Sequence, residues 1–187
     1  MAKEDGLIKL TSEGIEMSMD VINKELYERK DIAAIYAYNN KRGLQPPEEA
    51  IFHKYRENIC GKRVLDIGCG TGRTTPYLVN LATKYTGVDY SCEMIEFCKN
   101  TFKDIEDISF ILCDVRNMSI FEDNEFDFVL FSYNGLDCIC HEDRLKALSE
   151  IHRVLREKGL FVFSSHNINY RNIHSHPKLK FAVKPRE

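Results

Sequence analysis

The sequence predicts an α/β fold in which a parallel β-sheet is flanked by helices. From residue 62 onward, short β-type runs alternate with helical patterns, and this alternation is typical of right-handed βαβ units. A glycine-rich turn directly follows the first β-type run, at the place where an open parallel sheet usually binds its ligand. The 187 residues suffice for one domain with a sizeable core.

Five β-type runs are expected to form the strands. The run at 126–131 is nearly all apolar, which indicates a strand buried on both faces of the sheet. The predicted strands are 63–68, 84–89, 108–112, 126–131 and 160–164.

Three helices are expected between these strands. The first spans 71–81, with Pro76 tolerated only near its first turn. Ser91 is a good N-cap for the second, which runs to about residue 100. The third spans 142–158, where apolar residues recur every three or four positions, and Gly159 is expected to end it.

A mainly helical segment, residues 12–59, precedes the alternating pattern and is broken by Gly43 and by Pro46 and Pro47. We divide the chain into an N-terminal helical cap segment, 1–60, and a ligand-binding domain, 61–187. The first segment is expected either to cap one edge of the sheet or only to pack against it, since amphipathic helices serve both purposes.

Composition excludes several classes of protein. Lys and Arg total 26 against 29 Asp and Glu, giving a net charge of −3, which argues against a general nucleic-acid-coating role. No apolar run approaches the roughly 20 residues that span a bilayer, and no secretory signal is visible. Seven cysteines without a Cys-x-x-Cys pair predict reduced thiols in a cytoplasmic protein and no metal site.

The glycine-rich turn is the most informative stretch. Gly68, Gly70 and Gly72 follow the pattern Gly-x-Gly-x-Gly, whereas a dinucleotide site requires Gly-x-Gly-x-x-Gly. Arg73 stands where that last glycine is expected. The spacing suits a ligand without a pyrophosphate, namely a nucleoside carrying an amino-acid tail. Asp66, at the end of the strand, is expected to orient the loop or to meet the ammonium group of the tail.

A second carboxylate ends the second predicted strand. Asp89 lies 23 residues after Asp66, and a carboxylate at this place can accept both ribose hydroxyls, as the acidic residue of NAD sites does. Helix capping is the alternative for a lone Asp at a strand end. Beside the glycine-rich turn, the ribose role is preferred.

Residues 62–166 resemble the class I S-adenosylmethionine-dependent methyltransferases, whose sheet is Rossmann-like. VLDIGCGTGR is similar to the first motif of that family and GVDYSCEMI to the second. FILCDVRNMSIFEDNEFDFVLFSYNGLD is similar to the third and fourth motifs, and RVLREKGLFVFSSHN to the region of the fifth strand. The resemblance implies S-adenosylmethionine as the cofactor and a small molecule as the methyl acceptor.

The resemblance also implies roles for individual residues. By this likeness, the loop of Gly68, Cys69 and Gly70 passes under the methionine part and the ribose, and Asp89 binds the ribose hydroxyls. The adenine lies against Tyr90 and Met94, its amino group donates to Asp114, and the Val115 N–H meets the ring. The methionine ammonium faces the backbone of Phe131 and Ser132.

Some side chains are harder to assign. Arg73 is expected either to steady the loop or to clamp the methionine carboxylate. Tyr36, Tyr38 and Arg42 are further candidates near that carboxylate, because the lead helix of many relatives closes there. Packing and solvent exposure are the alternatives for these three.

Residues 132–137 are expected to face the transferred methyl group. The sequence assigns no catalytic residue, and the candidates are Tyr133, His141 and His166. As alternatives to a catalytic role, His141 simply begins a helix and His166 only lines the pocket. The stretch Ser-Tyr-Asn-Gly differs from the Asp/Asn-Pro-Pro-Tyr common in amino-methylating enzymes of nucleic acids, which argues against a nucleic-acid substrate.

Three functions are left open. The first is a methyltransferase acting on a small molecule. The second is a non-catalytic S-adenosylmethionine-binding module that regulates or partners another protein. The third is an NAD-dependent oxidoreductase, which the position of Arg73 and the presence of Asp114 disfavour.

The segment after the fifth strand is short. The resembled fold normally adds a C-terminal hairpin beside that strand, and residues 167–187 do not suffice for a helix and two strands. We expect the hairpin to be missing, either because this chain is truncated relative to a longer parent or because a partner or a second copy in a homodimer covers the edge. Residues 169–187 carry five basic side chains against one acidic side chain.

Overall fold

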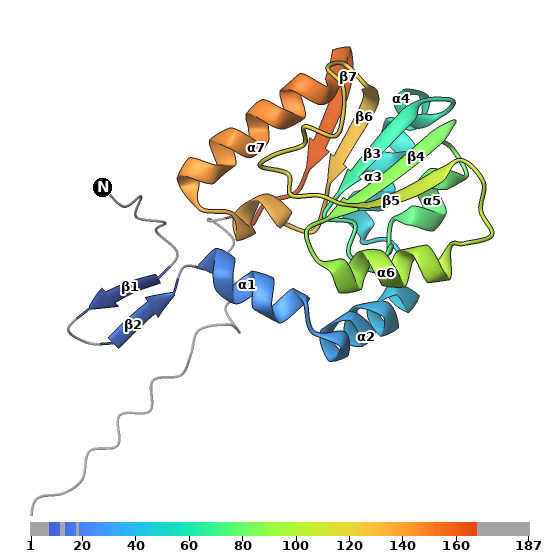
Figure 1. The fold of residues 1–187 in the computed structure, drawn as a ribbon. Coiled ribbons are helices and arrows are strands. Elements are labelled where there is room, and N and C mark those ends of the chain that lie inside the picture. Colours follow the sequence, from blue (N-terminus) through green and yellow to red (C-terminus); the bar gives the residue numbers. More distant parts are fainter. Residues whose placement is uncertain (1–7, 12–13, 18, 168–187) are drawn as a thin grey trace, which may run out of the picture.

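The computed structural model describes residues 8–11, 14–17 and 19–167 (Figure 1). A five-stranded parallel sheet forms its centre, in the order β5–β4–β3–β6–β7. After β5 the chain returns to the other side of β3, so the loops after β3 and β6 meet at a topological switch point. The strands are β3 (Arg63–Ile67), β4 (Lys84–Asp89), β5 (Ile108–Leu112), β6 (Phe126–Phe131) and β7 (Leu155–Phe163).

Alternate residues of the central strands face two separate core layers. Val129 and Phe131 of β6 pack toward α7 (His141–Val154), whereas Phe128 and Leu130 pack toward the helices on the opposite face. Figure 1 shows this layering, with α7 on one side of the sheet and α4, α5 and α6 on the other. The predicted α/β class and the burial of β6 on both faces are confirmed.

Two helices on that opposite face lie between successive strands. Helix α6 (Cys92–Thr101) is as predicted, with the Ser91 hydroxyl accepting from the Met94 N–H at 3.3 Å. The prediction for the preceding helix is wrong in length, because α5 spans only Thr75–Val79. The segment between Gly68 and Thr74 folds as a loop instead, held by a 2.5 Å hydrogen bond from the Thr74 hydroxyl to Asp66.

Helix α7 ends earlier than predicted. Leu155 already pairs with Phe126 in the sheet, and the register then shifts so that Phe128 pairs with Leu160. Arg156 fixes this irregular stretch by donating from Nη1 to Asp127 at 2.8 Å. The expected helix end at Gly159 is therefore wrong, because sheet pairing of Leu155 overrides the helical pattern of the sequence.

The N-terminal segment is only partly helical. A hairpin of β1 (Ile8–Thr11) and β2 (Gly14–Met17) comes first, in contrast to the helix expected from residue 12. The helices that follow are α1 (Met19–Tyr27), α2 (Lys30–Asn39), the 3₁₀ turn η1 (Asn40–Arg42), α3 (Pro46–Lys54) and α4 (Arg56–Ile59). Phe52 and Ile59 are buried in the same core layer as β3 and β4, so this segment is joined to the sheet by packing.

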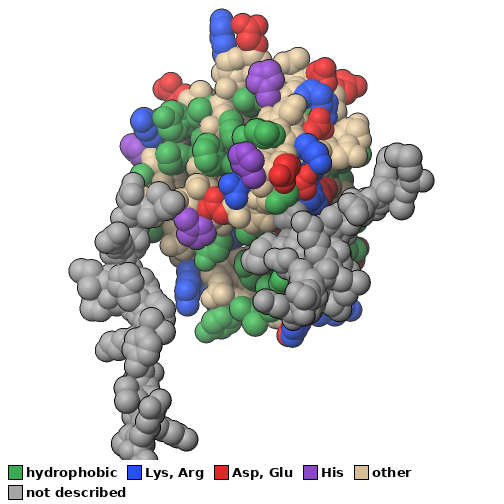
Figure 2. Space-filling model, turned by 90° about the vertical axis from the view of Figure 1, so that its left-hand side faces the viewer, with side chains coloured by type: hydrophobic (Ala, Val, Ile, Leu, Met, Phe, Trp, Pro, Cys, Tyr) green, Lys and Arg blue, Asp and Glu red, His purple; other side chains and the backbone are tan. Residues whose placement is uncertain are grey.

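Apolar side chains are exposed around the last strand. Leu145 and Leu148 of α7 are 61% and 41% exposed, and Phe163 of β7 is 53% exposed. Figure 2 shows this side of the molecule, where hydrophobic side chains gather among histidines. The expected missing hairpin and the covering of this edge by a second copy depend on residues 168–187, which lie outside the described residues, and both stay predictions. No helix in the described ranges has the length and apolar character needed to cross a membrane.

Candidate functional site

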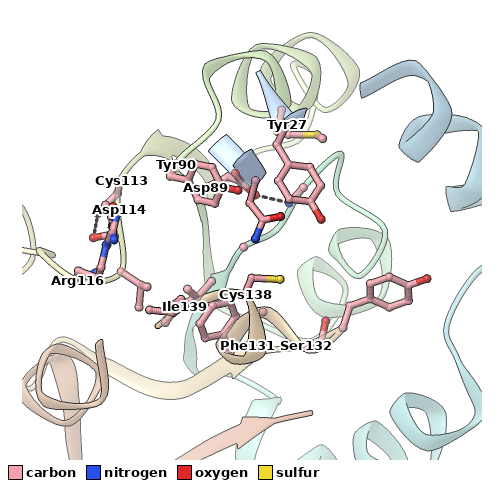
Figure 3. A pocket seen from close by; sticks show the side chains of 18 of the residues that line it. Tyr27, Asp89, Tyr90, Cys113, Asp114, Arg116, Phe131, Ser132, Cys138 and Ile139 are labelled. Atoms are coloured by element: carbon pink, nitrogen blue, oxygen red, sulfur yellow. Dashed lines mark hydrogen bonds and ion pairs between the residues drawn. The ribbon is translucent and has the colours of Figure 1, made fainter. Parts of the chain in front are cut away.

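A cavity of about 360 Å³ lies at the carboxyl ends of the central strands (Figure 3). Nine of the twelve side chains predicted to surround a cofactor line it: Gly68, Gly70, Asp89, Tyr90, Met94, Asp114, Val115, Phe131 and Ser132. The other three, Asp66, Cys69 and Arg73, lie behind the glycine-rich loop. The position of the cavity therefore follows from the sequence. Asp66, Cys69 and Arg73 are not among the residues that line it, so their roles are indirect.

The loop after β3 has room for a ligand at one glycine. Gly70 has a φ of +55°, and a Cβ built there would meet no heavy atom within 4 Å. Gly72 is different, since its Cβ would lie 2.5 Å from Cε2 of Phe102. Gly70 thus leaves the backbone open toward the cavity, while Gly72 allows close packing of the loop on α6.

Asp66 orients this loop from beneath. Its carboxylate is 1% exposed and accepts hydrogen bonds from the hydroxyls of Thr74, at 2.5 Å, and Tyr85, at 2.9 Å. Burial raises the pKa of Asp66 to about 6, although both hydroxyls oppose the shift. Of the two roles expected for Asp66, the geometry favours loop orientation.

Cys69 is buried beneath the same turn. Its thiol lies 3.8 Å from the Gly70 carbonyl oxygen, and the Cys98 thiol of α6 reaches the same oxygen at 3.2 Å. These contacts give Cys69 a packing role behind the cavity wall.

Arg73 is held by the N-terminal segment. Its guanidinium makes a two-pronged ion pair with the Glu48 carboxylate of α3, at 2.5 and 2.6 Å, and donates to the Gly43 carbonyl oxygen at 3.3 Å. The guanidinium also lies 5.1 Å from the centre of the Tyr133 ring. These partners favour loop support over a clamp on a ligand carboxylate.

Removing the carboxylate of Glu48 is expected to destabilise the fold. The Glu48 and Arg73 side chains are only 12% and 15% exposed, so Glu48→Ala leaves a largely buried cation without its partner. Breaking such a pair costs about 3 kcal/mol, which lowers the melting temperature by roughly 6–12 °C in a protein of this size. Thermal unfolding measures this, with the exposed neighbour Glu49→Ala as the control. Equal melting temperatures for the two variants would contradict the prediction.

Asp89 forms the centre of the cavity wall. Its carboxylate is 8% exposed and accepts the backbone N–H groups of Gly70 and Ser91, each at 2.9 Å. Burial raises the pKa of Asp89 above its ordinary value, against the effect of these N–H donors. A carboxylate oxygen can accept two hydrogen bonds, so capacity is left for hydroxyl groups of a ligand.

An apolar slot leads from Asp89 to Asp114. Tyr90 and Met94 line one part of it, and Leu112, 54% exposed, lines the open end. The Asp114 carboxylate accepts from Nη2 of Arg116 at 2.6 Å and from its backbone N–H at 2.9 Å. Desolvation would raise the pKa of Asp114, but the bonds from Arg116 outweigh it and hold the pKa below its ordinary value.

Arg116 was missed by sequence reasoning. It lines the cavity and also pairs through Nη1 with Asp143 of α7 at 2.8 Å. The spacing Asp-x-Arg was the available signal, because the two side chains meet across a tight turn.

Tyrosines from the N-terminal segment also line the cavity, and Figure 3 shows Tyr27 among them. Tyr27 and Tyr36 line it together with Asn23, and their hydroxyls lie 3.3 Å apart. The Tyr27 ring meets those of Tyr36 and Tyr90 edge-on, at 5.7 and 6.2 Å between centres. The Ser91 hydroxyl donates to the Tyr27 carbonyl oxygen at 2.7 Å. A covering role for this segment is therefore favoured over packing alone.

The other N-terminal candidates lie apart from the cavity lining. Tyr38 is 68% exposed, with the Lys41 ammonium 5.0 Å from its ring centre. Arg42 is exposed at the end of η1. Of the three N-terminal candidates, only Tyr36 lines the cavity. Tyr27 and Asn23 were missed, because nothing in a single sequence tells which face of α1 turns toward the sheet.

The loop after β6 forms the remaining wall. Tyr133, Gly135, Cys138 and Ile139 line the cavity there, the last two from η2 (Gly135–Cys138) and the residue after it. Tyr133 is 62% exposed and has a φ of 57°. Among the catalytic candidates only Tyr133 lines the cavity. His141 is exposed at the first position of α7, and His166 is exposed beside Asp137.

The sequence matches the family described as a methyltransferase domain over residues 64–159. This match spans more than half of the chain and contains the loop after β3, Asp89 and the loop after β6. The chain belongs to the class I S-adenosylmethionine-dependent methyltransferases.

Individual methyltransferases match a little over half of this chain. It is 38% identical to the demethylmenaquinone methyltransferase of Staphylococcus saprophyticus over 54% of the chain and 43% of that protein. It is 34% identical to the phthiotriol/phenolphthiotriol dimycocerosates methyltransferase of Mycobacterium tuberculosis over 57% of the chain and 38% of that protein. The chain therefore spans about two fifths of the length of these curated relatives.

Solved structures share the fold. The PH0226 protein of Pyrococcus horikoshii is 31% identical, with a TM-score of 0.56 over 62% of this chain and 53% of its own. An S-adenosylmethionine-dependent methyltransferase from Mesorhizobium loti superposes with a TM-score of 0.52 at 24% identity, over 58% of this chain and 48% of its own. The second likeness supports the fold alone.

The cavity fits the cofactor of the family to which the chain belongs. The open space above Gly70 accommodates a ligand that passes over the loop, and the buried Asp89 carboxylate offers acceptor capacity to a ribose. The slot lined by Tyr90 and Met94 suits an adenine ring, and the Asp114 carboxylate at its far end suits an amine. When bound, S-adenosylmethionine supplies an activated methyl group on sulfur.

Proposed function

We propose that this chain binds S-adenosylmethionine and transfers its methyl group to a small, uncharged, ring-bearing acceptor. The observation that carries the proposal is the buried Asp89 carboxylate beside the open backbone of Gly70, at the switch point of the sheet. The Arg73 position also supports it over an NAD-dependent oxidoreductase, because no third dinucleotide glycine is present.

The part of the cavity lined by the loop after β6 and by the N-terminal segment supports a flat, uncharged acceptor. Tyr27, Tyr36 and Tyr133 present aromatic rings there, beside the Asn23 side chain and the Cys138 thiol. Aromatic walls with a few hydrogen-bonding groups favour flat, neutral ligands. The relatives include enzymes named for demethylmenaquinone and for phthiotriol or phenolphthiotriol dimycocerosates, and these names are consistent with an apolar acceptor.

The protein contributes positioning to this reaction. Methyl transfer from a sulfonium needs an in-line approach and exclusion of water more than it needs covalent help from the protein. We propose that residues 1–60 act as the covering segment, because Tyr27 and Tyr36 lie over the cavity, and that residues 61–187 hold the cofactor. All seven cysteines are thiols, which supports a reducing compartment such as the cytoplasm.

Binding of S-adenosylhomocysteine tests the proposal directly. Isothermal titration calorimetry is expected to give one site per chain with micromolar or tighter affinity, and NADH is expected not to bind. A panel of small aromatic acceptors with a methyl-labelled donor then tests transfer. Binding without turnover on any acceptor would favour the non-catalytic module, while failure to bind S-adenosylhomocysteine would overturn the proposal.

A further inference from the structure

A polar cluster joins the loop after β6 to the chain that follows β7. The Asp137 carboxylate accepts through Oδ2 from Nδ1 of His166 at 2.6 Å and from the His166 backbone N–H at 2.7 Å. Its other oxygen accepts from the Ser165 hydroxyl at 2.9 Å. An aspartate thus holds an exposed histidine by both its ring and its backbone.

This arrangement assigns a definite tautomer to His166. The carboxylate of Asp137 places the ring proton on Nδ1, because an ionised carboxylate only accepts hydrogen bonds. The second ring nitrogen, Nε2, is then an acceptor and lies 3.2 Å from the side-chain amide nitrogen of Asn134. A neutral imidazole with its Nδ1–H held by a carboxylate is the form that takes up a proton at Nε2.

The cluster stands next to the cavity. Tyr133 and Gly135 line the cavity on either side of Asn134 in the sequence. The backbone of Tyr133 and Asn134 is left-handed at both residues, with φ of 57° and 62°, and the Asn134 N–H donates to the Ser164 hydroxyl at 2.8 Å. Such a conformation is unfavourable for non-glycine residues and persists where the surrounding structure holds it in place.

Exposure distinguishes the two members of the pair. The His166 side chain is 77% exposed, whereas that of Asp137 is 25% exposed. Both lie beyond the carboxyl ends of parallel strands, where ligands of such sheets bind. The histidine is therefore open to a molecule that reaches the β6 loop, while the carboxylate stays behind it.

We propose that His166, oriented by Asp137, is the general base for an acceptor that carries an aromatic hydroxyl group. The inference rests on the proposed function. The acceptor oxygen forms a bond to the methyl carbon as the bond from that carbon to the cofactor sulfur breaks. The acceptor hydroxyl replaces the Asn134 amide at Nε2 of His166 and passes its proton there, and the positive charge lost from the sulfonium is then carried by the imidazolium beside Asp137.

A purely structural clasp is the competing explanation. In that case His166 only ties the end of β7 to the β6 loop, and an asparagine that keeps a donor toward Asp137 would serve as well. The two explanations differ in whether the protein recognises a hydroxyl group on the acceptor.

Matched naphthalenes separate these explanations. The probes are 2-naphthol and 2-methoxynaphthalene, which differ in the hydroxyl proton, and calorimetry measures each against the protein saturated with S-adenosylhomocysteine. We expect the wild-type protein to bind 2-naphthol at least about tenfold more tightly, as one hydrogen bond to a positioned acceptor allows. His166→Asn and Asp137→Asn are expected to reduce the preference to within about twofold, while the exposed His152→Asn keeps it.

Methyl transfer provides a second readout. Formation of 2-methoxynaphthalene from 2-naphthol and S-adenosylmethionine is expected to fall at least about 100-fold in His166→Asn.

The outcomes are separable from those of the proposed function. If S-adenosylhomocysteine does not bind, the proposed function fails. Suppose instead that S-adenosylhomocysteine binds equally well to the wild-type protein and to His166→Asn. If the wild-type protein then binds 2-naphthol and 2-methoxynaphthalene with equal affinity, only the role of His166 fails. Unchanged melting temperature and cofactor affinity in His166→Asn establish that a lost preference is not a folding defect.

Discussion

Asp89→Ala is expected to abolish cofactor binding, lowering the affinity for S-adenosylhomocysteine by at least about 100-fold. Two hydrogen bonds from ribose hydroxyls to a buried carboxylate are worth about 1.5–3 kcal/mol each, and both are lost with the side chain. The N–H groups of Gly70 and Ser91 also lose their acceptor, so the loop over which the ligand passes is released. Calorimetric titration of S-adenosylhomocysteine measures the effect.

Two further variants sharpen this test. Asp89→Asn keeps the shape of the side chain but puts an NH₂ group where the backbone N–H groups need an acceptor, so it is expected to bind nearly as poorly as alanine. Asp104→Ala removes an exposed carboxylate from the loop before β5 and is expected to bind like the wild-type protein. Wild-type affinity in Asp89→Ala would remove the main support for the proposed site.

The sheet could be predicted from the sequence because its three central strands, β3, β4 and β6, are largely buried. The runs at 84–89, 108–112 and 126–131 match β4, β5 and β6 at both ends. The errors lie where tertiary contacts override a local pattern. Leu155 continues the apolar stripe of α7 in sequence, yet it pairs with Phe126 in the sheet. Thr71–Thr74 is compatible with a helix, yet it turns around the Asp66 carboxylate.

The site was predictable where one short motif carries it and less so where distant segments meet. Gly70 and Asp89 follow from spacing along the chain, and both line the cavity. Tyr27 comes from 62 residues before Asp89 in the sequence, and only the packing of α1 on the sheet brings them to one cavity. Asp137 became notable only when the structure placed His166 beside it, because no local pattern links residues so far apart.

The buried carboxylate of Asp66 is expected to make the protein less stable as the pH rises. Burial raises the pKa of Asp66 from 3.8 to about 6, so between these values the folded state holds a proton that the unfolded chain has released. Stability therefore falls from about pH 4 to about pH 6 through this group. A shift of this size corresponds to about 3 kcal/mol, a large fraction of the stability of a single domain.

Asp66→Asn isolates this contribution. The asparagine oxygen still accepts from Thr74 and Tyr85, but the side chain stays neutral, so the variant is expected to be up to about 3 kcal/mol more stable than wild type at pH 7 and nearly equal near pH 4. Urea unfolding of both proteins across this pH range measures the difference between their free energies of unfolding. Other carboxyls, such as Asp114, whose pKa is shifted in the opposite direction, contribute equally to both proteins and cancel in this difference. Asp104→Asn serves as the exposed control. Parallel stability curves for wild type and Asp66→Asn would contradict the prediction, because they would show that folding does not raise the pKa of Asp66. The expected gain indicates that the loop above Asp66 is maintained at a cost in stability, as binding loops often are.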